Sequence, residues 1–340
     1  MPCDGVRVTV LDENFIDILL PSTDRITRYG MDQHFSSKYG EILAENGLCC
    51  YVETFFAGNV TTVLFDTGLT APVVLHNAAL LGIDLAEVDA VVLSHGHPDH
   101  MGGVIGVLEA IGHPVPVIVH PDAFNPRMIV KPYVTLPMIN IGFSRERIER
   151  AGGGLIPARG PIQLGPGLQT SGEMETTFDF ELEAPAGRLC VHADGAVEPD
   201  GINDHQVLGI DIAGEGLLVI DPCGHRGIVS STEHMRKLFD SETVYGVMGG
   251  FHTGHPGISA NRIGNTARSL AEYAPRLIAP MHCSGFPLRR AVAEAAPDAF
   301  ELITAGSVIT IGNVPRQLSR RLATSSSANA FGSASQGPSS

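Results

Sequence analysis

The chain has 340 residues, a formal net charge of −15 at pH 7, 44% hydrophobic residues and 17% charged residues. These values are typical of a globular enzyme with a well-buried core. The acidic charge argues against a nucleic-acid partner, because no long run of Lys or Arg offsets it, and no apolar stretch reaches the ~20 residues of a transmembrane helix.

The first third of the chain predicts a succession of strands with one helix. Gly58 and Asn59 form a predicted turn between two strands. Apolar residues at helical spacing predict a helix over residues 71–81 that ends at Gly82. The predicted strands are residues 6–11, 48–56, 60–65 and 88–93, the last a continuous apolar run typical of a strand buried on both faces.

Beyond residue 100 the pattern alternates between helices and strands. Residues 125–188 are rich in Pro and Gly, and we interpret them as a lid or insertion over the site with irregular strands. The further predicted strands are residues 115–120, 189–192, 207–212, 217–220, 243–248, 276–280, 300–303 and 308–311. The further predicted helices are residues 102–111, 231–238 with Ser231 or Thr232 as cap, 261–273 and 288–295.

Two halves, each with its strands before its helices, predict a layered α/β sandwich. We expect one domain over residues 1–316, including the insertion at residues 125–188. Residues 317–340 are rich in Ser, Ala and Gly, and we expect them to be a disordered tail.

A dense group of metal-binding side chains follows the buried strand at residues 88–93. His95, His97, Asp99 and His100 fall within six residues, and imidazole and carboxylate groups suit Zn²⁺, Fe or Mn²⁺. The H-x-H step can place two imidazoles on one ion, and the D-H step can address a second ion. The spacing therefore predicts a metal centre that activates water; the alternative is a histidine-rich surface loop.

This H-x-H-x-D-H pattern resembles the signature of the metallo-β-lactamase superfamily, and the resemblance extends from residue 6 to about residue 311. It is most similar to a branch of metal-dependent hydrolases that includes the archaeal dihydropterin ribofuranosyl-aminobenzene phosphate synthases. The matching pieces are residues 64–68, 94–97, 223–228, 249–252 and 281–285. The resemblance implies an αββα sandwich, in which helices flank two mixed β-sheets.

The resemblance also implies a set of metal ligands. His95 and His97 would bind the first ion, Asp99 and His100 the second, and His282 corresponds to the final histidine ligand of the superfamily. Zn²⁺ is the expected metal, as one or two ions, with Fe or Mn²⁺ as alternatives.

Two further ligands remain open. Cys223 lies where the superfamily keeps a bridging Asp or Cys; Asp221 is a rival, and a buried core cysteine is the alternative. The third ligand of the first ion is expected to be His205. The alternatives to His205 are Asp204, His192 and His225.

Other polar residues are expected around the metals. Asp66 ends a strand and is expected to hydrogen-bond a ligand histidine. His252 follows two glycines and is expected to be a ligand, a general acid or a phosphate contact. His225 and His120 are expected to support the ligands or line the substrate pocket. His113, His234 and His255 are expected to face solvent.

Two departures from the branch keep the substrate open. Asn46 stands where the branch usually has histidine, and Cys223 lies in a Pro-Cys-Gly sequence rather than the commoner Gly-Cys-Ser.

We therefore expect a metal-dependent hydrolase that uses activated water on an ester, lactone or phosphoester, with Asp99 and His252 as catalytic residues. The alternatives are a pterin-linked synthase on the same metal site, a di-iron oxidoreductase, or a protein that binds metal without turnover. We expect a small-molecule substrate and neither nucleic acid nor membrane as partner, and leave a homodimer open. Six sparse cysteines without a C-x-x-C pair indicate reduced thiols, and no secretory signal is visible, so we expect a cytoplasmic location.

Overall fold

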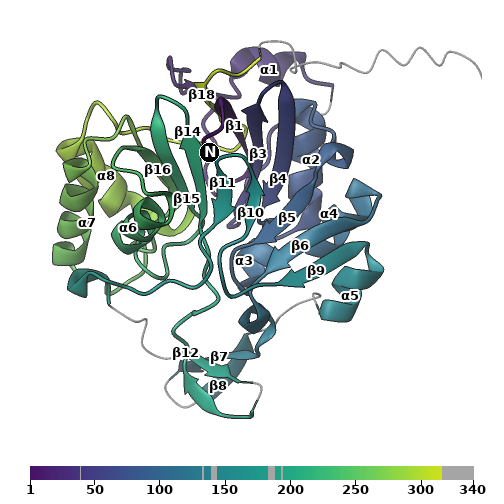
Figure 1. Ribbon diagram of the computed structural model, residues 1–340, viewed down its shortest axis with the longest axis vertical. Helices are drawn as coiled ribbons and strands as arrows, with labels where there is room; N and C mark the ends of the chain where they lie inside the picture. Colours follow the sequence, from purple (N-terminus) through teal and green to yellow (C-terminus); the bar gives the residue numbers. More distant parts are fainter. Residues whose placement is uncertain (39, 132–133, 139–143, 183–187, 193, 316–340) are drawn as a thin grey trace, which may run out of the picture.

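Two large β-sheets face each other, and helices cover the outer face of each (Figure 1). The computed structural model describes residues 1–38, 40–131, 134–138, 144–182, 188–192 and 194–315. The predicted tail at residues 317–340 lies outside these described residues. Within them, no helix is both long enough and apolar enough to cross a membrane.

The first sheet has eight strands in the order β2-β18-β1-β3-β4-β5-β6-β9. Its strands are β1 (Gly5–Asp12), β2 (Ile26–Thr27), β3 (Cys49–Phe56), β4 (Asn59–Phe65), β5 (Ala90–Leu93), β6 (Val115–Val119), β9 (Gly153–Pro157) and β18 (Val308–Gly312). The helices of this half are α1 (Met31–Ser36), α2 (Ala71–Leu81), α3 (Pro98–Met101), α4 (Val104–Ile111) and α5 (Arg145–Arg150), with the short 3-10 helices η1 (Leu85–Glu87) and η2 (Pro121–Phe124).

The second sheet has six strands in the order β10-β11-β14-β15-β16-β17. Its strands are β10 (Gln163–Gly165), β11 (Leu168–Thr170), β14 (Leu208–Ile212), β15 (Gly216–Asp221), β16 (Val244–Gly250) and β17 (Leu277–Met281). The helices of this half are α6 (Ile228–Phe239), α7 (Ala260–Glu272) and α8 (Gly285–Ala295), with the 3-10 helices η3 (Asp179–Glu181) and η4 (His282–Ser284).

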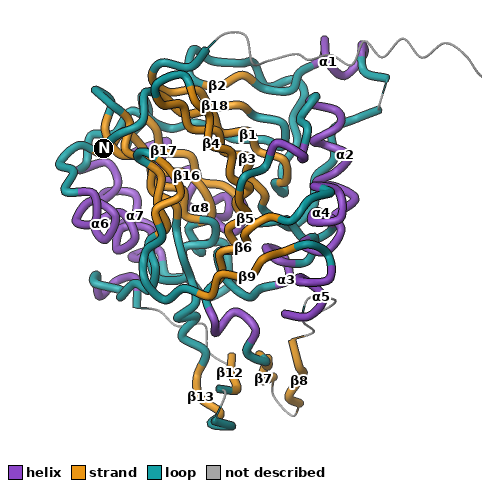
Figure 2. The backbone as a smooth tube through the Cα atoms, turned by 45° about the vertical axis from the view of Figure 1, so that its right-hand side comes forward, coloured by secondary structure: helices purple, strands orange, loops and turns teal. Residues whose placement is uncertain are grey.

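A small antiparallel sheet, in the order β13-β12-β7-β8, projects beyond the two main layers in both views (Figures 1 and 2). Its strands are β7 (Arg127–Lys131), β8 (Val134–Met138), β12 (Arg188–Val191) and β13 (Val197–Pro199). The segment expected to form a lid, residues 125–188, therefore divides. Its ends contribute to the small sheet, whereas α5 and β9 extend the first sheet and β10 and β11 the second.

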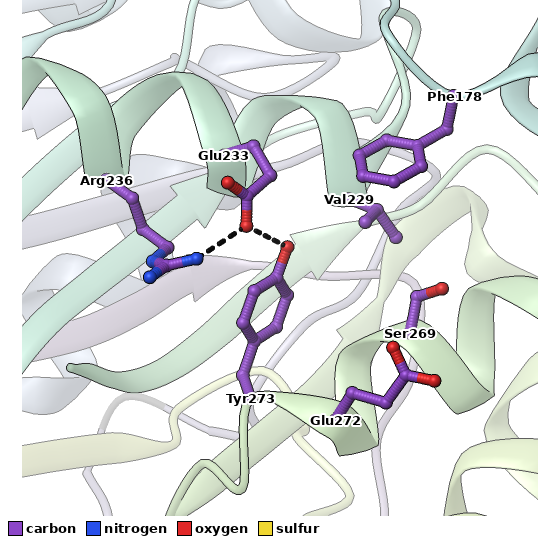
Figure 3. A pocket seen from close by; sticks show the side chains of 7 residues that line it. All are labelled: Phe178, Val229, Glu233, Arg236, Ser269, Glu272 and Tyr273. Atoms are coloured by element: carbon purple, nitrogen blue, oxygen red, sulfur yellow. Dashed lines mark hydrogen bonds and ion pairs between the residues drawn. The ribbon is translucent and has the colours of Figure 1, made fainter. Parts of the chain in front are cut away.

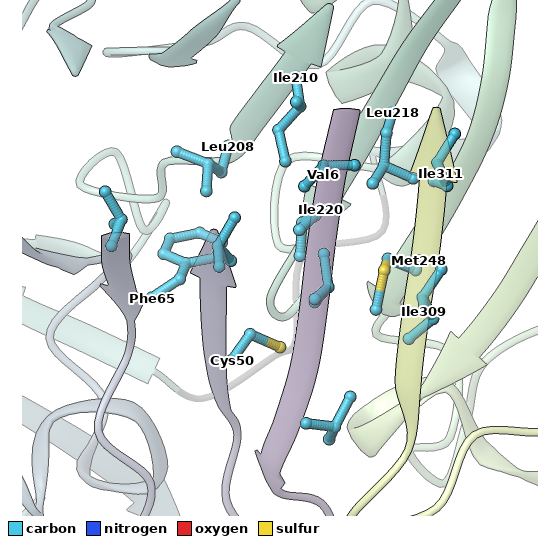
Figure 4. Close-up of a cluster of buried hydrophobic side chains, with 14 of the residues drawn as sticks. Val6, Cys50, Phe65, Leu208, Ile210, Leu218, Ile220, Met248, Ile309 and Ile311 are labelled. Atoms are coloured by element: carbon cyan, nitrogen blue, oxygen red, sulfur yellow. The ribbon is translucent and has the colours of Figure 1, made fainter. Parts of the chain in front are cut away.

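The largest apolar cluster fills the space between the two main sheets (Figure 4). Side chains of both sheets meet there because alternate residues of each strand point to the inner face. Members include Val6, Cys50, Phe65, Leu208, Ile210, Leu218, Ile220, Met248, Ile309 and Ile311. A second cluster lies between the first sheet and α2, α4 and α5, and a third between the second sheet and α6, α7 and α8. The expected αββα sandwich is thus confirmed.

Most predicted elements are present with small shifts of their ends, but two predictions were wrong. The helix predicted over residues 102–111 is α4, which begins two residues later than predicted. Residues 300–303 form no strand; Phe300 makes a single bridge to Ile278. Ser231 and Thr232 lie inside α6, which begins at residue 228 after Gly227.

Parallel strands of both sheets end where metal-binding residues begin. In the first sheet β4 and β5 are parallel, and in the second sheet β15, β16 and β17 are parallel. The two glycines that end β16 allow it to lie against β15: a Cβ at Gly249 would be 1.8 Å from the Asp221 backbone oxygen. Gly249 also has φ +122°, which favours glycine.

Asn77 of α2 generates a prediction about stability. Its fully buried side chain donates to the backbone oxygens of Leu11 and Leu43 and accepts from the Leu43 N–H. Asn77→Ala leaves these backbone groups without partners and should lower the free energy of unfolding by about 2–3 kcal/mol in a denaturant titration. Asn261→Ala, at an exposed position of α7, serves as the control and should change it by less than about 0.5 kcal/mol. Equal midpoints for the two variants would contradict this assignment.

Candidate metal centre

Three imidazoles converge at the ends of β5 and β15. Nε2 of His95 lies 3.0 Å from Nδ1 of His97 and 3.2 Å from Nε2 of His225. Burial, and then the proximity of other cationic groups, lowers the pKa of all three well below the usual histidine value. They are therefore neutral at pH 7, which is the form in which imidazole binds a metal.

A second group lies beside the first. His282 Nε2 is 3.3 Å from Oδ2 of Asp99, and His100 Nε2 is 3.9 Å from the same oxygen. Although burial opposes it, the hydrogen bond to Asp99 raises the pKa of His282 to about 9. Burial likewise opposes ionisation of Asp99, but His100 and His282 lower its pKa below the usual value.

Cys223 lies between the two groups. Its Sγ and ring nitrogens of His95 and His225 all lie within 4.8 Å of one another, and so do its Sγ and ring nitrogens of His100 and His282. Burial raises the pKa of the Cys223 thiol well above its ordinary value. Asp221, the rival for this position, accepts from the backbone N–H groups of Cys223 and Gly224. Cys223 rather than Asp221 thus reaches both sets.

Asp66 joins the histidine segment to the end of β4. Its Oδ2 accepts from the Ser94 hydroxyl and from Nδ1–H of His100, each at 2.7 Å, and its Oδ1 accepts from the Ser94 N–H. Because His100 donates from Nδ1, its Nε2 keeps a free lone pair toward Cys223 and His282. This is the role expected for Asp66.

A buried ion-pair network holds the other side of the histidine segment. Asp204 accepts from the Gly96 N–H at 2.7 Å and pairs with the almost completely buried Arg127. Arg127 also donates to Asp200 at 2.8 Å. Asp204, weighed as a ligand from the sequence, is therefore a positioning group for the loop between His95 and His97.

The backbone of His282 is fixed from the N-terminal half of the chain. Its N–H donates to both carboxylate oxygens of buried Glu13, at 3.1 and 2.9 Å, and its carbonyl oxygen accepts from the Asn14 side chain. Arg289 pairs with Glu13 at 3.0 Å and offsets part of the cost of burying that carboxylate.

Three residues of the site have backbone conformations that side chains rarely adopt. Asp66, His252 and His282 have φ of 59°, 49° and 42°. Each such conformation costs roughly 1 kcal/mol or more, and it persists only where surrounding contacts hold the residue in place. For Asp66 and His282, the hydrogen bonds described above hold the residue in this conformation.

His252 and Cys283 extend the cluster on the side of Cys223. Nδ1 of His252 is 3.6 Å and Sγ of Cys283 is 3.3 Å from Sγ of Cys223, and the His252 N–H donates to Sγ of Cys283. The ring of His252 also packs against the ring of His225, with centroids 4.1 Å apart and the ring planes tilted by 50°. It thus lies at the metal-binding cluster, as its expected role requires.

The structure does not bring His205 into the converging groups. Its Nε2 contacts Asp221 at 2.9 Å, and within the described part of the chain no group of three converging ligand atoms includes it. His225, one of the alternatives for the third ligand, does lie in such a group with His95 and Cys223. The remaining alternative, His192, is half-exposed in the small sheet and lies 3.6 Å from Glu198.

His120 lies in a separate cluster. Its Nδ1 accepts from the Asp122 N–H, and its Nε2 contacts Glu173 at 2.8 Å. Arg159 pairs with both acidic residues, so a cation already neutralises this cluster. His120 is therefore not brought together with the histidines of the metal-binding cluster.

Of the histidines expected to face solvent, His113 and His255 are exposed. The prediction was wrong for His234, which is half-buried and whose Nε2 contacts the Ser171 carbonyl oxygen at 3.1 Å.

The cluster fits a metal centre on the chemistry of its own atoms. Buried ring nitrogens that converge here, such as Nε2 of His97, His100 and His252, have no hydrogen-bond partner among the described residues. A buried polar atom without a partner costs about 1–3 kcal/mol. A cation would satisfy several of them at once and would stabilise the thiolate of Cys223.

A separate pocket on the helix-covered face of the second sheet contains no group of metal-binding side chains among its lining residues. It has a volume of about 290 Å³ and lies between α6 and α7 (Figure 3). Its polar groups satisfy each other, since Glu233 accepts from both Arg236 and Tyr273 at 2.7 Å. None of its lining residues belongs to the metal-binding cluster.

The sequence alone gave no reason to place Glu13, Arg127 or Arg289 at the site. None of the three belongs to a local motif, and Glu13 is 269 positions away from His282, whose N–H it binds. Cys283 stands next to a predicted ligand within a matching piece, and that adjacency was the available signal.

Comparison with known proteins identifies the family of the chain. The family model of the Metallo-beta-lactamase superfamily matches residues 49–282. The chain is 32% identical over 290 residues to the 7,8-dihydropterin-6-methyl-4-(beta-D-ribofuranosyl)-aminobenzene-5'-phosphate synthase of Methanocaldococcus jannaschii, covering 84% of this chain and 97% of that one. An uncharacterized protein of the same archaeon is 28% identical over 251 residues, which is 74% of this chain and 88% of that protein.

Among solved structures, a metal-dependent hydrolase of the beta-lactamase superfamily is similar with a TM-score of 0.66 and 22% identity. The similarity covers 91% of this chain and 100% of that chain, and it shows a shared fold. The chain belongs to the metallo-β-lactamase superfamily.

Proposed function

We propose that this protein is a metal-dependent enzyme with two cation positions, at least one of which holds Zn²⁺. The observation that carries the proposal is the place of Cys223, whose Sγ is within reach of both histidine groups. A thiolate among imidazoles favours Zn²⁺ over harder cations. The first position would be held by His95, His97 and His225, the second by Asp99, His100 and His282, with Cys223 shared.

We propose that the reaction is hydrolysis of an ester, lactone or phosphoester in a small molecule. Bound divalent cations would lower the pKa of water toward neutrality and polarise the substrate oxygen. Asp99, whose side chain is 26% exposed, would accept a hydrogen bond from the attacking water and orient it. His252 has Nδ1 3.6 Å from Sγ of Cys223, and its Nε2 has no hydrogen-bond partner among the described residues, so we propose that it donates a proton to the leaving group.

A synthase is the second candidate, and one observation favours it. The archaeal relative whose name describes a dihydropterin-linked aminobenzene phosphate synthase aligns over 97% of its length. The same residues would then hold a pterin and an aryl phosphate close together rather than admit water.

An assay can separate the two reactions. Zinc-loaded protein is incubated with ester, lactone and phosphodiester substrates and, separately, with an aminobenzene ribofuranosyl phosphate plus a reduced pterin that carries a leaving group, such as diphosphate, on its 6-methyl carbon. Release of acid or alcohol from the first panel supports hydrolysis. Appearance of a joined product together with an equal amount of the released leaving group supports the synthase, and full activity after complete metal removal would refute both.

The proposed place of His225 among the ligands yields a direct prediction. His225→Ala should remove an imidazole from the first position, lower bound zinc measured by elemental analysis, and reduce turnover about 100-fold or more. His192→Ala changes the rejected alternative in the small sheet and should keep the wild-type zinc content and rate. Full zinc occupancy in the His225→Ala protein would overturn the assignment.

The hydrogen bonds of Asp66 yield a second prediction about metal binding. Asp66→Asn fits the left-handed backbone, but its amide has one oxygen where the carboxylate uses two, so its NH2 group would face either the Ser94 N–H or the Ser94 hydroxyl and His100 Nδ1–H. Zinc affinity, measured by competition with a chromogenic chelator, should fall about 10- to 100-fold. Asp298→Asn, at an exposed position, should leave the affinity unchanged; the same affinity in both variants would argue against a supporting role for Asp66.

A further inference from the structure

Cys283 has no role in the proposed reaction, although it directly follows the proposed ligand His282. Its Sγ is 3.3 Å from Sγ of Cys223, and the backbone N–H of His252 donates to it at 3.3 Å. Cys223 and His252 are buried, and Cys283 is only partly exposed. Two thiols and an imidazole therefore lie together largely away from water, and this combination of groups suits a soft cation.

The separations among these three side chains are close to those of a tetrahedral zinc site. Ligand atoms of Cys223, His252 and Cys283 all lie within 4.8 Å of one another. With Zn–S bonds of about 2.3 Å and Zn–N bonds of about 2.0–2.1 Å, two sulfurs on one zinc are about 3.8 Å apart, and a sulfur and a nitrogen are about 3.6 Å apart. Here the two sulfurs are 3.3 Å apart, and Sγ of Cys223 is 3.6 Å from Nδ1 of His252. A cation would therefore require the two sulfurs to separate by only about half an ångström.

Hydrogen bonds hold together the two segments that carry His252 and Cys283. The Gly254 N–H donates to the Cys283 carbonyl oxygen at 2.9 Å, and the Thr253 hydroxyl donates to the Ser284 carbonyl oxygen at 2.7 Å. Gly250 leaves room for the thiol, because a Cβ there would lie 2.8 Å from Sγ of Cys283. The fold itself thus brings these ligand atoms together.

We propose that Cys223, Cys283 and Nδ1 of His252 form a third cation position, which takes Zn²⁺. This position goes beyond the proposed function, which uses two cations and gives Cys283 no part. Cys223 belongs to this group of converging atoms and to the two groups of the proposed function, so its thiolate would bridge the ions. With the cation on Nδ1, the ring proton of His252 lies on Nε2, the nitrogen from which the proposed reaction takes a proton.

The first test counts bound zinc in the full-length protein. Wild type, Cys283→Ala and Cys190→Ala are freed of metal, reloaded with excess zinc, desalted and compared by elemental analysis. Cys283→Ala should hold one zinc ion fewer per chain than the wild type. Cys190→Ala is the matched control, because its thiol lies in β12 of the small sheet and belongs to no converging group of the described residues; it should hold as much zinc as the wild type. Equal zinc content in the wild type and Cys283→Ala overturns the inference.

Cobalt substitution gives a second readout that does not depend on activity. Thiolate-to-Co²⁺ charge transfer absorbs in the near ultraviolet, and the band grows with the number of Co–S contacts. Cys283→Ala should lose about half of this band, because loss of the third ion removes its contacts with both sulfurs. His252→Ala keeps both thiols and should lose the same ion, which decides the question should Cys283→Ala not fold.

The outcomes separate this inference from the proposed function. A difference of one ion between the wild type and Cys283→Ala supports the third position whatever the total, whereas the two positions of the proposed function depend on the ions that remain in Cys283→Ala. A cobalt band of equal intensity in the two proteins overturns the third position. So does a wild type in which mass spectrometry without reductant shows Cys223 and Cys283 joined as a disulfide in the zinc-loaded protein, because the two sulfurs would then not be free to bind the ion.

Discussion

The site depends on a constraint set by desolvation: imidazole and thiol groups lie together away from water, and several of their ring nitrogens have no hydrogen-bond partner among the residues that the structure describes. Neutral histidines cannot all donate to one another, and protonated ones would repel at these separations. A shared cation resolves both difficulties. The surrounding polar network then has a clear task, which is to keep the lone pairs of the rings directed inward.

That task is divided among segments far apart in the sequence. Asp66 sets the tautomer of His100, Asp204 fixes the loop between His95 and His97, and Glu13 holds the backbone of His282. Two of these carboxylates, Asp204 and Glu13, are themselves neutralised by buried or half-buried arginines. Each supporting group would be costly alone, and it is tolerated because its charge is matched locally.

The sequence was informative where the signal was local. The H-x-H-x-D-H spacing and the apolar runs before it predicted both the strand ends and most of the candidate ligands, because strands buried on two faces are continuous apolar segments. It did not distinguish His205 from His225, since position along the chain does not reveal that Nε2 of His205 contacts Asp221 whereas His225 lies within reach of His95 and Cys223. In the small sheet the strand at residues 189–192 was predicted, but the bounds of the others were not, because they are short and lack clear alternation.

The sequence could not predict hydrogen-bond and ion-pair partners that are far apart along the chain, and the reason is physical. Glu13 and Arg127 look like ordinary charged residues until the two sheets pack, and only then does burial make their pairing obligatory. Ser231 and Thr232 show the opposite kind of error, because both are residue types that favour the N-terminal cap of a helix but neither is the cap here. Gly227 is the N-cap instead, and α6 begins one turn earlier, near Cys223.

The left-handed backbone at Asp66, His252 and His282 has a consequence for protein engineering. Glycine at any of the three would relax the chain locally, whereas the residues present hold it in an unfavourable conformation. A glycine substitution that raises the melting temperature would at the same time remove a carboxylate or an imidazole from the metal-binding cluster. Engineering campaigns that rank variants by melting temperature should protect them from replacement.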